Sequence, residues 1–429
     1  MINFKSLSIK NFFYLFCDKF LASIINFFVL IYIARYLGPE NFGILSYAYS
    51  IIAIVFSLSS LGLEQIIIKD LINFKSKTFE IVGTALFARI TVTVILIILW
   101  SIISISVVDR IVYYLGIIIS LNYLFLSFDI IDYFFQSVSK FKLKTIARIS
   151  GILISASFKL LFIYLHLDLV FFGFIYILDA LFVSFFYIYF FRKEGFELYK
   201  IKINFEYLIG SSKKALPLLL STLIIIIYMR TDQIMIKQFL DSNSVGYYTA
   251  ALKISEIWYF FPVAIGQIIY PNLIKFKEEA ESKYKKYLQK VYDLMIYISL
   301  PVALLFTFLS DSVINFIYGT DYLEANSVLS IHIWSSLFVF VGIISTRWLV
   351  IENLQRYTFV RSVIGVVVNI GLNFALIPKF GISGAAIATL ISQIFASYLS
   401  YLFSSNTFIA FKMISKSLLM LNLFKKTNV

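Results

Sequence analysis

Long apolar runs follow one another along almost the whole chain, with short polar links between them. Runs of eighteen or more residues recur, and each is long enough to cross a hydrocarbon layer of about 30 Å as a helix. The pattern predicts an all-α polytopic membrane protein with about twelve transmembrane helices. The predicted helices cover residues 12–33, 42–63, 81–108, 111–135, 145–166, 169–191, 214–238, 245–269, 288–309, 327–350, 358–378 and 381–404.

The composition agrees with a membrane protein. Of the 429 residues, 60% are hydrophobic and only 14% are charged, which soluble domains do not show. The single cysteine, Cys17, excludes an internal disulfide and a thiolate metal cluster. The first apolar run starts near Phe12 and has no small-residue cleavage site, so the first helix is expected to be retained.

The basic residues alternate between the two sides of the predicted membrane. Of 37 Lys and Arg residues, 27 fall in the termini and links of one side, four in the links of the other, and six within spans. Because basic residues concentrate on the cytoplasmic side, both termini are expected in the cytoplasm. The net charge of +13 then reflects topology, and no nucleic-acid partner is expected.

Two internal matches suggest a duplicated architecture. Residues 33–51, "IARYLGPENFGILSYAYSI", align without a gap with 236–254, "IKQFLDSNSVGYYTAALKI", and "FFGFIYILDAL" from Phe171 matches "KFGISGAAIATL" from Lys379. Both matches place the first six helices on the last six in the same direction, as in transporters built from parallel repeats; ancestral duplication without transport is the alternative. The predicted organisation is a six-helix bundle at 1–192, a cytoplasmic linker at 193–213, a second bundle at 214–404 and a cytoplasmic amphipathic tail at 405–429.

The tail is interrupted by Lys412 and Lys416, which makes a membrane span less favourable. It is predicted to be a helix lying in the cytoplasmic interface, with a thirteenth span as the alternative.

The chain resembles the polysaccharide and O-antigen lipid-linked oligosaccharide flippases of the multidrug/oligosaccharidyl-lipid/polysaccharide exporter superfamily. The resemblance is carried by "ARYLGPENFGILSYA", "RTDQIMIKQFLDSNSVGYYTAALKI" and "KFGISGAAIATLISQ". It implies two six-helix bundles around a central cavity. It also implies a substrate of oligosaccharide joined through diphosphate to undecaprenol, moved from the cytoplasmic to the periplasmic leaflet, with a polysaccharide polymerase and a chain-length regulator as candidate partners.

Charged residues within the spans are candidates for the substrate site, because a charge at bilayer depth costs at least ~2.5 kcal/mol unless it faces a cavity or a partner. Lys19 begins a polar stripe that continues at Ser23 and Asn26. Arg230 and Asp232 are two residues apart, so they are expected to point to different neighbours. Cations such as Lys19 and Arg230 would match the charge of a diphosphate, although Arg230 could instead extend to the outer surface.

Two further pairs are less decisive. Lys253 and Glu256 are three residues apart and can pair with each other, as a structural bridge or as part of the cavity. Asp129 and Asp132 could together exchange a proton or bind Na⁺, or they could contact water or the basic loop that follows.

Four other polar residues have no assigned role in transport. Arg89 and Asp179 are candidates for a buried ion pair, whereas His166 and His332 are expected at the surface, without metal-ligand spacing. Tyr248 is one of several tyrosines that could stack on sugar rings or anchor the membrane interface.

Three functions remain. A flippase is favoured; the alternatives are a multidrug exporter of the same fold coupled to Na⁺ or H⁺, and a membrane enzyme. No catalytic constellation supports the enzyme, since the chain has two histidines and one cysteine. No cofactor and no metal site are expected. The chain lacks a GxxxxGK[ST] phosphate loop, so the membrane potential is the expected driving force.

Overall fold

The computed structural model describes residues 4–196 and 202–419, without the side chains of 4–13 and 15–19. Over these ranges the chain is helical and contains no β-strand, which confirms the all-α prediction. The chain divides into two compact units, Met1–Arg230 and Thr231–Val429. The division falls within helix α9 (Phe205–Phe239), which therefore belongs to both units.

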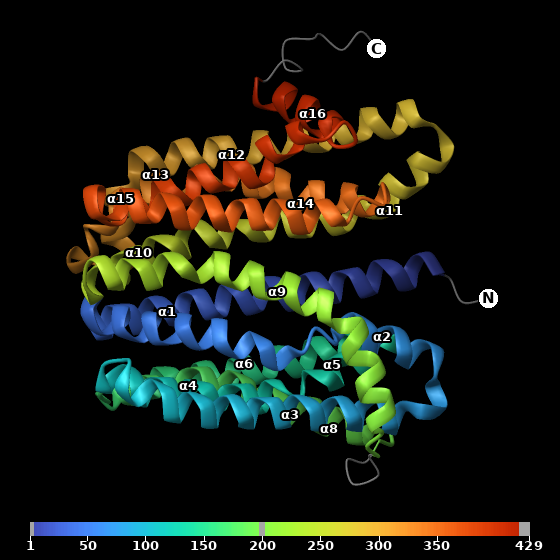
Figure 1. The fold of residues 1–429 in the computed structure, drawn as a ribbon, viewed down its shortest axis with the longest axis horizontal. Helices are drawn as coiled ribbons and strands as arrows, with labels where there is room; N and C mark the ends of the chain where they lie inside the picture. Colours follow the sequence, from blue (N-terminus) through green and yellow to red (C-terminus); the bar gives the residue numbers. More distant parts are fainter. Residues whose placement is uncertain (1–3, 197–201, 420–429) are drawn as a thin grey trace. The chain divides into compact units, whose positions relative to one another are not determined.

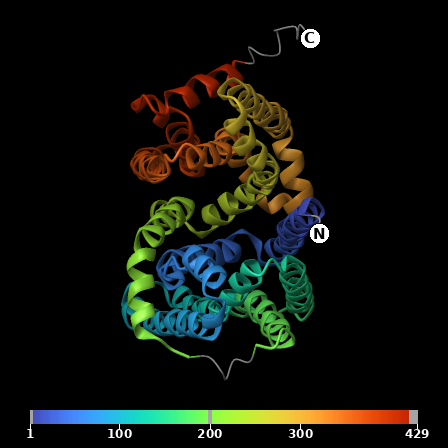
Figure 2. The same cartoon turned by 90° about the vertical axis from the view of Figure 1, so that its right-hand side faces the viewer.

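The helices of the first unit run alongside one another. Figure 1 shows α3, α4 and α8 side by side, and Figure 2, turned by 90°, shows the helices of this unit nearly end-on. Helix α6 packs against both α1 and α8. The unit contains α1 (Phe4–Phe56), α2 (Glu64–Asn73), α3 (Thr78–Ile103), α4 (Arg110–Leu126), α5 (Asp129–Ser137), α6 (Phe141–Tyr164), α7 (Leu169–Phe172), α8 (Phe174–Lys193) and the first part of α9.

The second unit is also built of helices that pack against one another. Helix α14 packs against both α12 and α15, and α10 packs against α13 (Figure 1). The unit contains the end of α9, α10 (Ser242–Glu256), α11 (Phe260–Glu279), α12 (Glu281–Tyr318), α13 (Ala325–His332), α14 (Ser335–Ile351), α15 (Arg356–Ser397) and α16 (Phe408–Leu418).

The longest helix in each unit is two helices joined at a glycine. Gly38 interrupts α1 with φ 69° and ψ 172°, and Gly381 interrupts α15 with φ 60° and ψ −142°. Both values of φ favour glycine, which has no Cβ to clash with the backbone. Pro39 follows the first break, at the start of a helix where its missing N–H removes no hydrogen bond. Each break therefore turns one continuous helical run into two crossings.

The described helical segments are compatible with the twelve predicted crossings. Nine helical segments are long and apolar enough to span a membrane, and the bent pair α13 and α14 forms a tenth. The two longest segments have 54 and 48 residues. At 1.5 Å per residue each would extend over about 70 Å or more, at least twice the hydrocarbon thickness. Their breaks at Gly38 and Gly381 make each of them two spans, in agreement with the predicted number.

The predicted linker and tail can be compared only in part. Helix α9 begins at Phe205, so the last residues of the predicted linker, 193–213, are helical. In the tail, α16 has eleven residues, too few for a span of about 20. It packs on α12, where the Ser417 hydroxyl donates to Asp293 at 2.6 Å. The cytoplasmic position of both segments stays a prediction.

Candidate functional site

The most extensive polar cluster of the second unit surrounds the carboxylate of Asp232, which is only 7% exposed. It accepts hydrogen bonds from the hydroxyls of Tyr248 and Thr389, both at 2.5 Å. It also accepts from the side-chain amides of Asn369 at 2.9 Å and Asn373 at 2.7 Å. We call these five residues the Asp232 cluster. All four partners are buried and neutral, so among the described residues the carboxylate is hydrogen-bonded without being paired to a cation.

The helix geometry explains why these side chains meet. Asn369 and Asn373 are four residues apart on α15 and therefore lie on one face of the helix. Thr389 lies beyond the break at Gly381, so the two arms of α15 approach Asp232 together. The arms pack closely, because a Cβ on Gly384 would collide with the backbone carbonyl of Leu376. Tyr248 completes the cluster from α10.

The chemistry of the Asp232 cluster suits a small hard cation. Carboxylate, amide and hydroxyl oxygens are the ligands that such ions prefer. The Oδ1 atom of Asn373 is buried and has no hydrogen-bond partner within the described part of the chain. No group of three or more His, Cys, Asp or Glu side chains that could hold a metal ion occurs in that part of the chain. A monovalent cation or a proton on Asp232 would neutralise its charge.

His332 adjoins this cluster, and its predicted surface position is wrong. The side chain is 2% exposed, and its Nδ1 lies 2.8 Å from the hydroxyl of Ser255. The ring of Tyr248 lies edge-on to the imidazole, with centroids 6.4 Å apart. His166 is exposed, as predicted. The histidine of the second unit is thus part of its buried interior.

Arg230 contacts the first unit, whereas Asp232 is bonded within the second. The guanidinium carbon of Arg230 lies 4.9 Å from the ring centroid of Tyr49. Tyr49 in turn stacks on Tyr176, with centroids 4.3 Å apart and an interplanar angle of 10°. The prediction that Arg230 and Asp232 point to different neighbours is therefore confirmed.

The remaining predicted cavity residues have less definite surroundings. Lys253 and Glu256 form an ion pair at 2.9 Å, which confirms their predicted pairing. Lys19 lies in α1, but its side chain falls outside the described residues. Contact of these residues with a substrate stays a prediction.

The two aspartates proposed for cation coupling belong to a network with basic residues. Lys144, which is 7% exposed, donates to Asp132 at 2.8 Å, and Gln136 donates to the same oxygen at 3.1 Å. Lys144 comes from the basic segment after the predicted fourth helix. For Asp132 this confirms the alternative prediction, in which the aspartate contacts that basic segment. Asp129 is partly buried and lies within electrostatic range of Arg89. Cation binding by this pair stays a prediction.

The predicted pairing of Arg89 with Asp179 is wrong. Lys159 of α6 donates to Asp179 of α8 at 2.6 Å. Lys159 is 5% exposed, so this ion pair is part of the packing between the two helices. The separation of 20 residues along the chain gave no indication of it.

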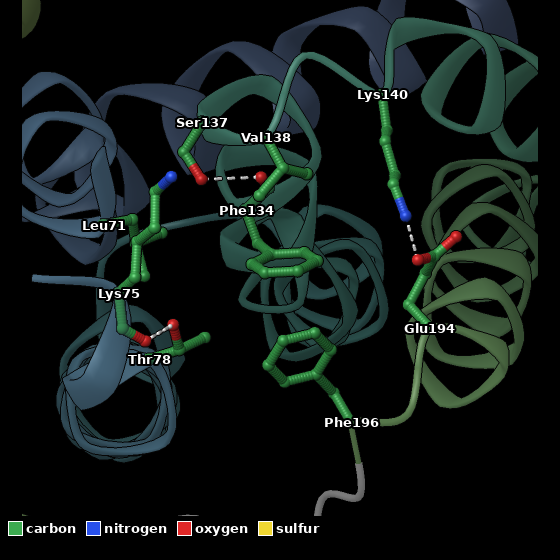
Figure 3. Close-up of a pocket in the computed structure, with 9 residues that line it drawn as sticks. All are labelled: Leu71, Lys75, Thr78, Phe134, Ser137, Val138, Lys140, Glu194 and Phe196. Carbon is green, nitrogen blue, oxygen red and sulfur yellow. Dashed lines mark hydrogen bonds and ion pairs between the residues drawn. The ribbon is translucent and has the colours of Figure 1, made fainter.

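A separate cavity of about 200 Å³ lies at one end of the first unit, among residues of the lysine-rich links (Figure 3). The rings of Phe134 and Phe196 form part of its lining, with centroids 4.6 Å apart. Lys140 and Glu194 form an ion pair at its edge. None of the residues predicted for the substrate site lines this cavity.

Sequence reasoning missed three members of the Asp232 cluster: Asn369, Asn373 and Thr389. It also assigned Tyr248 to sugar stacking or the membrane interface, whereas this side chain is buried and bonded to Asp232. A signal was present in "VVVNIGLNFALI", where two amides four residues apart interrupt an apolar span. Such spacing places polar groups on one helix face as clearly as charges do.

Solved structures identify the fold. The inward-closed form of the lipid II flippase MurJ has a TM-score of 0.73 at 16% identity, over 96% of this chain and 93% of that chain. An inward-facing multidrug resistance MATE family transporter has a TM-score of 0.72 at 15% identity, over 95% of this chain and 96% of that one. The protein is thus a polytopic membrane protein with the fold of the MATE transporters and MurJ, as the sequence resemblance implied.

Family models and a relative that matches over nearly its full length show to which family within this fold the chain belongs. The model of the polysaccharide biosynthesis protein family matches residues 8–277, and that of the lipid II flippase MurJ matches residues 160–426. The capsular polysaccharide biosynthesis protein CapF of Staphylococcus aureus is 26% identical over 416 residues, which cover 92% of this chain and 98% of CapF. The chain belongs to the polysaccharide biosynthesis protein family.

Proposed function

We propose that the protein is a flippase for lipid-linked oligosaccharides. It moves undecaprenyl-diphosphate-linked repeat units from the cytoplasmic to the outer leaflet, where O-antigen or another surface polysaccharide is assembled. The observation that carries this proposal is the family membership, in which the polysaccharide biosynthesis and MurJ family models together match residues 8–426. The protein acts as a transporter without catalysis and resides in the inner (cytoplasmic) membrane of a bacterial cell, with both termini in the cytoplasm.

The substrate requires cations along its path. A diphosphate cannot enter a low-dielectric layer unless its charge is matched. In this proposal Arg230 and Lys253, with Lys19, supply that charge while the prenyl chain stays in lipid. Glu256 keeps Lys253 in place through their ion pair. A polymerase and a chain-length regulator then act on the translocated unit.

The Asp232 cluster supplies the coupling. A buried carboxylate with only neutral donors is costly in its charged form, so binding of Na⁺ or a proton stabilises the second unit. The inside-negative potential acts in addition, because each negative charge moved outward gains ~2.3 kcal/mol per 100 mV. Cation binding at Asp232 and the field on the diphosphate thus both drive the cycle.

A multidrug exporter is the second candidate, favoured by the MATE-like fold together with the buried carboxylate. Such an exporter would bind organic cations, for which acidic cavity residues are needed. The candidate residues of this chain are instead mixed, with Arg230 held on a tyrosine and Lys253 paired to Glu256. A candidate site that contains both basic and acidic residues fits an anionic substrate better than an organic cation.

The test is transport in proteoliposomes of the purified full-length protein. The probe is a fluorescent polyprenyl-diphosphate-linked N-acetylglucosamine, and its movement between leaflets is followed by quenching. We expect transport that is accelerated by an imposed potential and by a Na⁺ or proton gradient. Ethidium in the same vesicles serves as the organic-cation probe. Movement of ethidium without movement of the lipid-linked sugar would refute the flippase and establish the exporter.

A further inference from the structure

Arg230 differs from two other intramembrane cations in the kind of partner that holds it. Lys159 is paired with Asp179 and Lys253 with Glu256, each through a carboxylate within 3 Å. The described contact of Arg230 is the face of an aromatic ring, Tyr49, at 4.9 Å. A carboxylate cancels the charge of its partner, whereas an aromatic quadrupole attracts a cation and leaves its net charge in place. Arg230 is therefore held without being neutralised.

The supporting ring is itself stacked on a second ring. The guanidinium lies over the ring of Tyr49, and the ring of Tyr176 is stacked nearly parallel to Tyr49 at 4.3 Å. Tyr49 comes from α1 and Tyr176 from α8, so two helices of the first unit hold the stack. A contact with a ring face pairs the guanidinium with no carboxylate, so its fork of N–H groups can donate to a ligand. Arg230 is half-buried, which is compatible with such access.

We propose that Tyr49 and Tyr176 are positioning residues that hold Arg230 as the diphosphate ligand of the flippase. This inference rests on the proposed function. The fork of an arginine matches two phosphate oxygens at once, and a ligand that is oriented before binding loses less entropy when it binds. The tyrosine stack thus provides both a fixed orientation and an uncancelled positive charge.

The experiment measures binding of farnesyl diphosphate and farnesyl monophosphate to the purified full-length protein in detergent, by calorimetry. The variants are Tyr49→Phe, Tyr49→Leu, Arg230→Gln and the double variant Tyr49→Leu/Arg230→Gln. Tyr36→Leu is the matched control, because Tyr36 is also on α1 and stacks on Phe172 at 5.4 Å, with no cation of the described residues over its ring. Its hydroxyl donates to the carbonyl of Leu167, so this variant also reports the loss of a hydrogen bond. Thermal unfolding of every variant reports whether the fold is retained.

We expect the wild type to prefer the diphosphate. Tyr49→Leu weakens diphosphate binding about tenfold, or about 1.4 kcal/mol. Tyr49→Phe, which keeps the ring, and Tyr36→Leu stay within about threefold of the wild type. In the Arg230→Gln background Tyr49→Leu has no further effect, because the ring then has no cation to place.

Two results would overturn the inference in distinguishable ways. If the wild type binds the diphosphate no better than the monophosphate, the proposed substrate class fails and the inference fails with it. If the wild type prefers the diphosphate but Tyr49→Leu weakens binding equally with and without Arg230, the proposed function stands and Tyr49 acts only in packing.

Discussion

Each unit contains a carboxylate at membrane depth, and the two are held in opposite ways. In the first unit Asp179 is paired with Lys159 at 2.6 Å. In the second, Asp232 is surrounded by two hydroxyls and two amides within 3 Å, all of them neutral. The first charge is cancelled by the protein itself and serves packing. The charge of Asp232 is stabilised by hydrogen bonds but is not cancelled, which leaves a role for a cation from outside the protein.

The same contrast applies to the cations. Lys159 is neutralised within its unit, whereas Arg230 rests on the Tyr49 ring and keeps its charge. Charges that the protein does not cancel are those that can exchange partners during a transport cycle. The comparison therefore separates structural charges from candidate transport charges without any reference to conservation.

The largest expected effect is on stability, from Asp179→Asn. Removing the carboxylate leaves the buried ammonium of Lys159 uncompensated, so the free energy of unfolding should fall by about 3–5 kcal/mol. Replacing both members, in Lys159→Met/Asp179→Leu, should recover most of this loss. Thermal or denaturant unfolding in detergent measures the free energy of unfolding of each variant. Asp232→Asn is the matched control, and an equal loss there would remove the distinction between the two carboxylates.

The next largest effect is on cation binding, from Asp232→Asn. Without the charge of the carboxylate, the affinity for the coupling cation should fall by about a hundredfold, or about 2.7 kcal/mol. Stabilisation against heat by Na⁺ or by protons measures this affinity, together with the gradient dependence of transport. Asp179→Asn should keep the wild-type response. An Asp232→Asn protein that still responds to both gradients would move the coupling site elsewhere.

A smaller effect is expected from Thr389→Val. This nearly isosteric change removes one oxygen from the Asp232 cluster and should weaken cation binding about tenfold. Thr249→Val is the matched control, because Thr249 is also buried in the second unit but is bonded to Gln233. We expect less than a threefold change there, measured by the same thermal shifts. Equal effects of the two variants would indicate general packing.

Much of the fold could be predicted from the sequence, because the length of an apolar run and the side on which lysines fall are local properties. The breaks at Gly38 and Gly381 lie at or near predicted links, and Arg230 and Asp232 diverge as their spacing requires. Which residues meet across helices could not be predicted. Asp179 pairs with Lys159 and not with the predicted partner Arg89. This pairing depends on how α6 packs against α8.

The site was recovered only in part for a related reason. A charge within an apolar span identifies Asp232, whereas its neutral partners Asn369 and Asn373 carry no such signal. The sequence predicts a surface position for His332 because this residue lies near the end of a predicted span. The helix instead bends between α13 and α14, and α13 packs against α10, which buries the imidazole beside Ser255.

The smallest expected effect concerns the pair of Lys253 with Glu256, which is partly exposed. Exposed pairs contribute little, so Lys253→Gln should lower the unfolding free energy by only about 0.5 kcal/mol. Lys285→Gln is the matched control, since Lys285 pairs with Glu281 at 3.0 Å on the same unit. Transport of the lipid-linked probe should fall about threefold in Lys253→Gln, because a cation proposed to contact the diphosphate is lost. Unchanged transport in both variants would show that Lys253, like Lys159, is a structural charge that is neutralised within the protein.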